Sequence, residues 1–65
     1  MNAYRFVEKL ITLDYSKAME ECQLLADYQE DNYNRGVTIF HFDQLNINII
    51  FDFNVLEFVV KLIGG

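Results

Sequence analysis

Cysteine and basic residues are scarce in this 65-residue chain, and each shortage excludes a class of protein. The single cysteine, Cys22, cannot form an internal disulfide, so we expect a reducing, cytoplasmic compartment. Five Lys and Arg against ten Asp and Glu give a net charge of −5. That balance argues against direct binding to nucleic acid or to an anionic membrane, because both need clustered cations. No uncharged apolar run approaches the roughly 18 residues of a transmembrane helix, and no secretory signal is visible.

Signatures of catalysis and metal binding are also missing from the sequence. There is no glycine-rich phosphate loop, nucleophile elbow or paired-cysteine motif. His41, the only histidine, would need a nucleophile or a second base for catalysis and further ligands for a metal. Cys22 has acidic neighbours, which raise a thiol pKa, and we expect it in the core. The sequence therefore predicts a non-enzymatic protein without metal or cofactor.

What the chain has in excess is apolar surface near its C-terminal end. Twelve of the seventeen residues from Ile47 to Ile63 are large and apolar. A single domain of this length, spanning 1–65, buries only about 60% of the surface that its unfolded chain exposes. We therefore expect another chain to cover part of this surface, most simply a second copy in a homodimer. The predicted oligomer interface comprises Ile39, Ile50, Val55, Phe58, Val59 and Leu62.

Two N-terminal helices are predicted from the spacing of apolar residues. Residues 3–12 place apolar side chains at i, i+3, i+4 and i+7, which form one helical face, and Asn2 is a candidate cap. A second helix is expected over 15–32, with Asp14 as its N-cap and an apolar stripe along one side. Gly36 suits the turn after its end.

A β-hairpin is predicted over 37–42 and 47–53, where β-branched and aromatic residues dominate. Pairing Phe42 with Ile47 across the loop 43–46 gathers the large side chains of both strands on one face. A slip of one residue would mix apolar and polar side chains. The expected register therefore also contains the pairs Phe40–Ile49, Thr38–Phe51 and Ile39–Ile50.

The last segment, 55–63, has features of both a helix and a strand. Asn54 and Glu57 match a capping box, and Glu57 and Lys61 form a favourable i, i+4 pair. Against these stand the alternation of its apolar residues and its four β-branched residues, which are typical of a strand. A strand needs a chain reversal after Phe53, for which Asn54 alone is a poor turn. We expect a helix, and so an α+β fold of two N-terminal helices, one antiparallel hairpin and a short C-terminal helix.

A candidate partner surface lies on the predicted second helix. Glu20, Asp27 and Asp31 share the side opposite its apolar stripe, and Leu24 and Tyr28 lie beside them. The bland interpretation is a solvated helix face. An apolar and aromatic pair among carboxylates also suits a basic partner. We therefore hypothesise a small acidic protein that binds another protein, at a basic groove, and inhibits or regulates it.

In its small size, acidity and frequent asparagine, the chain resembles accessory proteins encoded by phages, including antagonists of host defence and of host nucleic-acid enzymes. That resemblance implies a viral inhibitor. A second hypothesis is a structural or assembly subunit that binds through the apolar C-terminal third. A third comes from Gly64-Gly65, which resembles the tails of ubiquitin-like modifiers and sulfur carriers, whose last carboxylate is activated as an adenylate. Those families open with a hairpin, whereas helices are expected first here.

Overall fold

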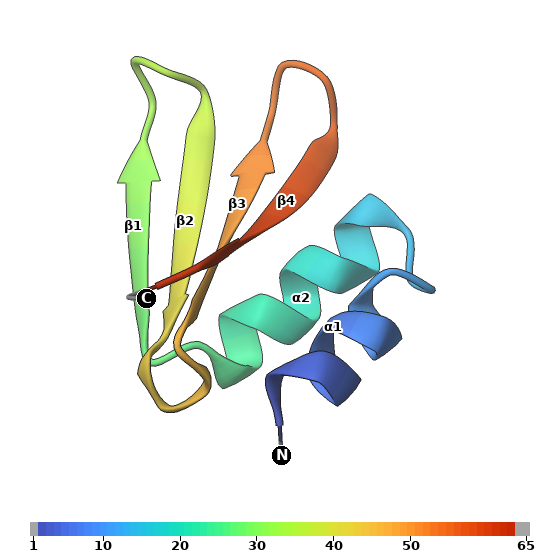
Figure 1. The fold of residues 1–65 in the computed structure, drawn as a ribbon. Coiled ribbons are helices and arrows are strands. Elements are labelled where there is room, and N and C mark those ends of the chain that lie inside the picture. Colours follow the sequence, from blue (N-terminus) through green and yellow to red (C-terminus); the bar gives the residue numbers. More distant parts are fainter. Residues whose placement is uncertain (1, 64–65) are drawn as a thin grey trace.

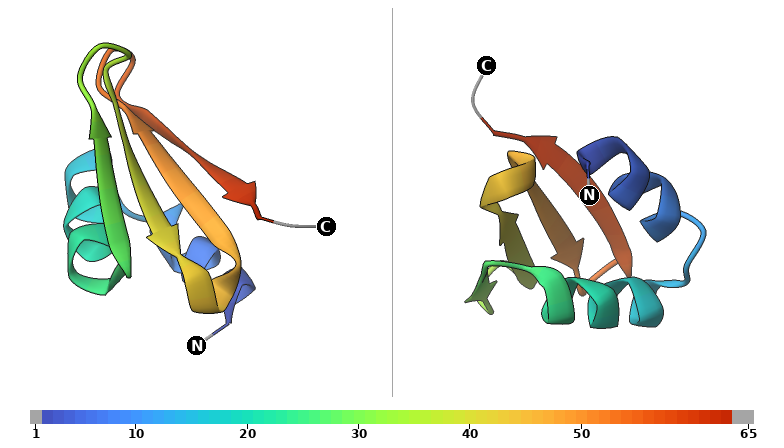
Figure 2. Two further views of the ribbon diagram at one scale, coloured as in Figure 1. Left: turned by 90° about the vertical axis from the view of Figure 1, so that its left-hand side faces the viewer. Right: turned by 90° about the horizontal axis from the view of Figure 1, so that it is seen from below.

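The computed structural model describes residues 2–63 and shows two helices followed by an antiparallel sheet in the order β1-β2-β3-β4 (Figure 1). Both helices pack against one face of this sheet and leave the other face open (Figure 2). The predicted α+β class is confirmed. No helix within residues 2–63 is long and apolar enough to cross a membrane. The elements are α1 (Ala3–Leu10), α2 (Tyr15–Leu25), β1 (Tyr28–Asn32), β2 (Val37–Phe42), a 3₁₀ turn (Asp43–Leu45), β3 (Ile47–Asp52) and β4 (Glu57–Leu62).

Both helices begin where the sequence predicts. The Asn2 side chain accepts a hydrogen bond from the Arg5 N–H at 2.8 Å, and the Asp14 side chain accepts one from the Lys17 N–H at 2.9 Å. Each cap satisfies a backbone donor that the first helical turn leaves without a partner. The two N-caps are therefore confirmed.

The predicted second helix, 15–32, is wrong beyond its first eleven residues. Helix α2 ends at Leu25, and Ala26 takes an extended conformation with ψ 144°. Tyr28–Asn32 then forms β1, which pairs with β2 along its whole length. Residues 28–32 carry no apolar pattern of their own, so long-range pairing with β2 decides their conformation against the weak local preference for a helix.

The hairpin of β2 and β3 has the predicted register at every position. Phe42 lies opposite Ile47, and the remaining pairs run in step to Val37 and Asp52. A 3₁₀ turn connects the strands, and Asn46 closes it at φ 55°, a left-handed conformation that asparagine tolerates well. The separation of apolar from polar side chains therefore sufficed to define this pairing.

The predicted C-terminal helix over 55–63 is wrong, because Glu57–Leu62 forms β4 on β3. The chain reverses over residues 53–56 instead of beginning a helix at Asn54. The Asp52 side chain stabilises this turn. Its Oδ1 accepts hydrogen bonds from the backbone N–H of Asn54 at 2.8 Å and from that of Val55 at 3.4 Å. Leu56 completes the reversal at φ 56°. The alternating apolar residues after it, which favoured a strand, are then free to pair.

The core lies between the two helices and one face of the sheet. Phe51 is its centre: its ring centroid lies 5.4 Å from Phe40, 5.4 Å from Tyr15 and 5.0 Å from Phe58. Edge-on and offset aromatic contacts of this kind add to the free energy gained from burial. The buried apolar residues are Phe6, Leu10, Ala18, Cys22, Phe40, Phe42, Ile47, Ile49 and Phe51.

Candidate functional site

The open face of the sheet presents three cross-strand rows of side chains. Its middle row is mostly apolar and runs Glu30–Ile39–Ile50–Val59 across the four strands. The flanking rows are mostly polar. One is Tyr28–His41–Asn48–Lys61, and the other is Asn32–Val37–Asp52–Glu57. This face therefore combines a narrow apolar stripe with charged borders.

His41 lies on this open face, half-buried, with Asn48 across the strand as predicted. The Tyr28 ring centroid lies 5.2 Å from the imidazole, and Nε2 lies 3.4 Å from Glu30 Oε1. Sequence reasoning missed both neighbours because it placed residues 28–32 on a helix. Protonation of His41 would make its contact with Glu30 an ion pair. This grouping places no nucleophile beside the imidazole.

Cys22 is fully buried beneath the sheet, as predicted. Burial, with a smaller effect from the Glu21 carboxylate, raises the pKa of its thiol to about 12. A thiol in this state is a poor nucleophile, since the thiolate is the reactive form. Among residues 2–63, no three His, Cys, Asp or Glu side chains gather closely enough to hold a metal ion.

The predicted acidic partner surface does not form a single helix face. Glu20 and Leu24 are exposed on α2, but Asp27, Tyr28 and Asp31 lie beyond the end of that helix. Tyr28 belongs to the open face, whereas Asp31 faces the helix side of the sheet, where its Oδ1 accepts from the buried Thr38 hydroxyl at 2.8 Å. Two of the carboxylates therefore stabilise the fold: besides Asp31, the Asp27 Oδ2 accepts from the Asp43 N–H at 2.8 Å.

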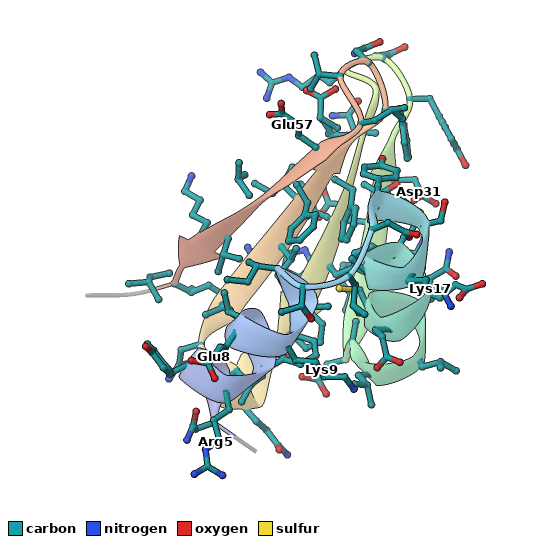
Figure 3. All side chains as sticks on the ribbon, turned by 90° about the vertical axis from the view of Figure 1, so that its right-hand side faces the viewer. Arg5, Glu8, Lys9, Lys17, Asp31 and Glu57 are labelled. Carbon is teal, nitrogen blue, oxygen red and sulfur yellow. The ribbon has the colours of Figure 1, made fainter. Side chains whose placement is uncertain are left out.

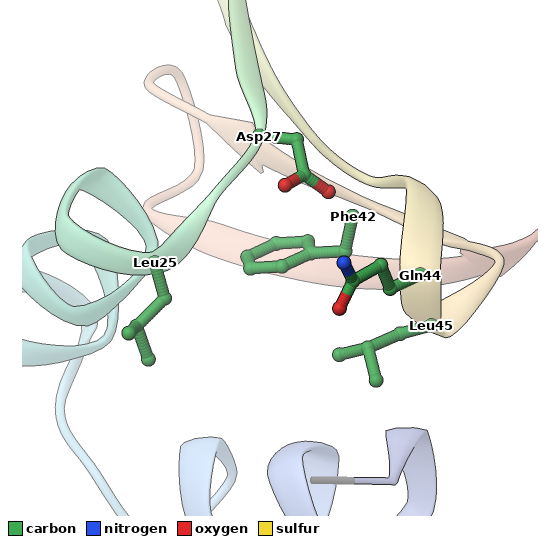
Figure 4. A pocket seen from close by; sticks show the side chains of 5 residues that line it. All are labelled: Leu25, Asp27, Phe42, Gln44 and Leu45. Atoms are coloured by element: carbon green, nitrogen blue, oxygen red, sulfur yellow. The ribbon is translucent and has the colours of Figure 1, made fainter.

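What the structure does bring together is an acidic edge of the sheet. Strand β1 is an outer strand, and the segment from Asp27 to Asn32 carries three carboxylates and no cation. A recess of about 100 Å³ adjoins this edge near the end of α2 (Figure 4). Its lining combines apolar side chains with polar ones and consists of Leu25, Asp27, Phe42, Gln44 and Leu45.

The predicted oligomer interface is divided between two faces of the sheet. Ile39, Ile50 and Val59 form the apolar part of the middle row on the open face. Phe58 points to the opposite side and stacks on Phe51 in the core. The remaining two residues, Val55 in the turn after β3 and Leu62 at the end of β4, are both exposed.

The outer edge of β4 is bordered by an apolar groove that sequence reasoning did not find. This groove, of about 380 Å³, separates α1 from the end of β4. Its lining residues are Ala3, Tyr4, Val7, Ile47, Val60 and Leu62. A smaller hollow of about 170 Å³ continues along α1 over Tyr4, Val7, Glu8 and Ile11. Tyr4, Val7 and Ile11 recur at i, i+3 and i+7, a spacing in the sequence that could have revealed a second apolar side of α1.

No family model matches this chain, and comparison with curated proteins and with solved structures gave no significant match.

Proposed function

We propose that this protein is a non-enzymatic, cytoplasmic binding protein that inhibits or regulates another protein through the edge formed by β1 and the end of α2. One observation carries the proposal: β1 is an exposed outer strand whose segment from Asp27 holds three carboxylates and no cation. An outer strand has backbone N–H and C=O groups directed to solvent, which an extended segment of another protein can pair with.

The charge of this edge favours a basic partner segment. Glu30 and Asp31 are exposed on the strand itself, and the exposed Glu20 lies on the neighbouring helix. Opposite charges of this kind mainly accelerate encounter and select among partners. Binding strength would come from apolar contact, to which Leu24, 79% exposed, and Tyr28, 59% exposed, would contribute large side chains.

The target class that fits best is an enzyme with a basic groove, such as one that handles nucleic acid. An acidic edge with an adjoining apolar side chain would occupy that groove in competition with the natural anionic ligand. The resemblance to phage accessory proteins in size, acidity and asparagine content points to the same class. Gly64 and Gly65, on which the carrier hypothesis depends, lie outside the described residues.

The experiment is affinity capture from a native lysate, followed by an inhibition assay on the purified target. The variants Glu20→Lys and Leu24→Ala alter side chains that are exposed in the structure. We expect both to lose the target. Glu8→Lys on α1 applies the same charge change away from this edge (Figure 3) and should retain it. A target that binds Glu20→Lys and Leu24→Ala as well as wild type would contradict the proposed surface.

A further inference from the structure

The opposite edge of the sheet, β4, differs chemically from β1. Its residues that point to the open face are Glu57, Val59 and Lys61, and those that point to the helix side are Phe58, Val60 and Leu62. Val59 is 58% exposed and Leu62 is 79% exposed. An outer strand that is long, apolar and without a partner is a template for pairing with another strand.

The hydrogen-bond pattern shows which backbone groups of β4 face outward. The Ile63 N–H donates to the Asn46 carbonyl at 2.9 Å, in step with the β3–β4 ladder. In an antiparallel ladder, hydrogen-bonded and non-hydrogen-bonded pairs alternate. The odd-numbered residues of β4 therefore bond to β3, while the N–H and C=O groups of Phe58, Val60 and Leu62 point away from the sheet.

The charges along β4 are incompletely matched within one chain. Glu57 lies directly opposite Asp52 on β3, which places two carboxylates side by side, a destabilising arrangement. Lys61 lies opposite the neutral Asn48. In the part of the chain that the structure describes, the only contact between a Lys or Arg and a carboxylate within 4.0 Å is Lys9–Glu21, so Lys61 has no carboxylate partner.

We propose that the protein forms a symmetric homodimer in which β4 pairs antiparallel with β4 of a second copy, centred on Val59. This register places Glu57 opposite Lys61 of the second copy, and the symmetry repeats the pair. It also places Phe58 opposite Val60, so that their outward backbone groups form a hydrogen-bonded pair. Glu57 and Lys61 then occupy non-hydrogen-bonded pairs, in which side chains lie closest.

Neighbouring registers lack this match. Shifting the pairing by two residues keeps the backbone pattern but places Glu57 and Lys61 opposite apolar residues instead of each other. Shifting it by one residue places outward backbone groups opposite groups already bonded to β3. Of these registers, only the one centred on Val59 both pairs outward backbone groups with each other and places Glu57 opposite Lys61.

The same register covers the groove between α1 and β4. On the helix side of the sheet, Val60 and Leu62 would face Phe58 and Leu56 of the second copy. Both Leu56 and Leu62 are strongly exposed in the single chain, and Leu62 lines the groove together with Tyr4. A symmetric contact uses this surface twice and closes the assembly. The acidic β1 strands remain at the two outer edges, available for the partner proposed above.

The test is a charge exchange read by sedimentation equilibrium. Wild type should be a dimer that dissociates on dilution. Glu57→Lys and Lys61→Glu should each place like charges opposite one another twice per dimer and weaken association by about tenfold or more. The double variant, E57K together with K61E, restores opposite charges and should recover the dimer. Lys17→Glu, on α2 across the molecule from β4 (Figure 3), is the matched control and should leave association unchanged.

Circular dichroism on each variant checks that the fold is retained, so that loss of the dimer is not loss of structure. A wild-type protein that stays monomeric throughout the micromolar range would overturn the proposal. So would growth into open-ended oligomers, which indicates β1–β4 pairing. A dimer that tolerates both single substitutions, or that the double variant fails to restore, would overturn the register.

Discussion

At the scale of single residues, the backbone makes demands that only certain side chains meet. Gly36 lies in the turn between β1 and β2 at φ 74°, where an L side chain is strained. Its carbonyl also accepts a hydrogen bond from the Phe53 N–H at 2.8 Å, which connects this turn to the one after β3. A Cβ at this position would lie 2.6 Å from Asn54 Nδ2. The two turns at this end of the sheet therefore depend on a residue without a side chain.

Gly36→Ala should lower the free energy of unfolding by about 1–2 kcal/mol, because a left-handed alanine is strained and the added methyl group displaces Asn54. Urea denaturation measures the loss. Asn34→Ala, in the same turn and exposed, should change the unfolding free energy much less. If the contact with Asn54 matters, the cost of Gly36→Ala will be smaller in an Asn54→Ala background; equal losses for Gly36→Ala and Asn34→Ala would contradict the backbone argument.

Cys22 makes stability depend on pH in the alkaline range. In the unfolded chain its thiol ionises near its ordinary pKa of 9.0, whereas burial raises the folded pKa to about 12. The raised folded pKa means that this contribution to stability is complete below pH 9 and is lost as the pH rises toward 12. By pH 10.5, wild type should lose about 2 kcal/mol more unfolding free energy than Cys22→Ala does over the same range. Parallel pH profiles for the two proteins would show that the buried thiol does not ionise on unfolding as argued.

At the scale of elements, the sequence was sufficient to predict an element where nearby residues alone separate apolar from polar side chains or provide a cap. Asn2 and Asp14 cap their helices as predicted, and the β2–β3 register follows from apolar alternation. The sequence was insufficient where an element forms by pairing with a distant one. Strand β1 is polar and gains its structure from β2, while β4 needed a turn in which the Asp52 side chain accepts the key hydrogen bonds.

The residues of the candidate site were also predicted correctly where local pattern decides their position, and wrongly where long-range pairing does. Cys22 and His41 lie where their own patterns place them, in the core and on the open face. Glu20 and Leu24 are exposed on α2 as expected, but Tyr28 moves to the sheet when the helix ends early. The groove beside β4 joins residues from α1, β3 and β4, so no single segment contains its signal.

The turn between β3 and β4 is strained at Leu56, whose φ of 56° suits glycine. Leu56→Gly should therefore raise the unfolding free energy of the monomer by about 0.5–1 kcal/mol, since Leu56 is 63% exposed and little burial is lost. The measurement is urea denaturation at concentrations low enough to populate the monomer. Val55→Gly, one residue earlier and without a positive φ, should instead destabilise. A loss of stability in Leu56→Gly would mean that the leucine side chain makes a contact that outweighs the strain.

At the scale of the whole molecule, the two edges of the sheet are chemically different, which is why we propose different partners for them. Edge β1 is polar and acidic, so pairing with itself would place carboxylates together, whereas β4 is apolar with one charge of each sign. The apolar C-terminal third forms a strand instead of the predicted helix, so its side chains divide between the two faces of the sheet. In the strand, alternate residues such as Phe58 pack inward, and it is the edge and the groove that remain uncovered.

A backbone modification separates the edge contact from every side-chain effect. The chain is short enough for chemical synthesis, so a single N-methyl group can replace the amide hydrogen of Val60 while its side chain is kept. Since that N–H points away from β3, the monomer should retain its circular dichroism spectrum, but the second copy can no longer pair, and sedimentation should show a monomer.

The same methyl group on Asp31, whose N–H points outward from β1 by the same alternation, should leave the dimer intact. N-methylation of Val59 should disrupt the β3–β4 ladder itself and lower stability, which checks the assignment of inward and outward groups. A dimer that survives methylation of Val60 would show that the two copies do not meet through this edge.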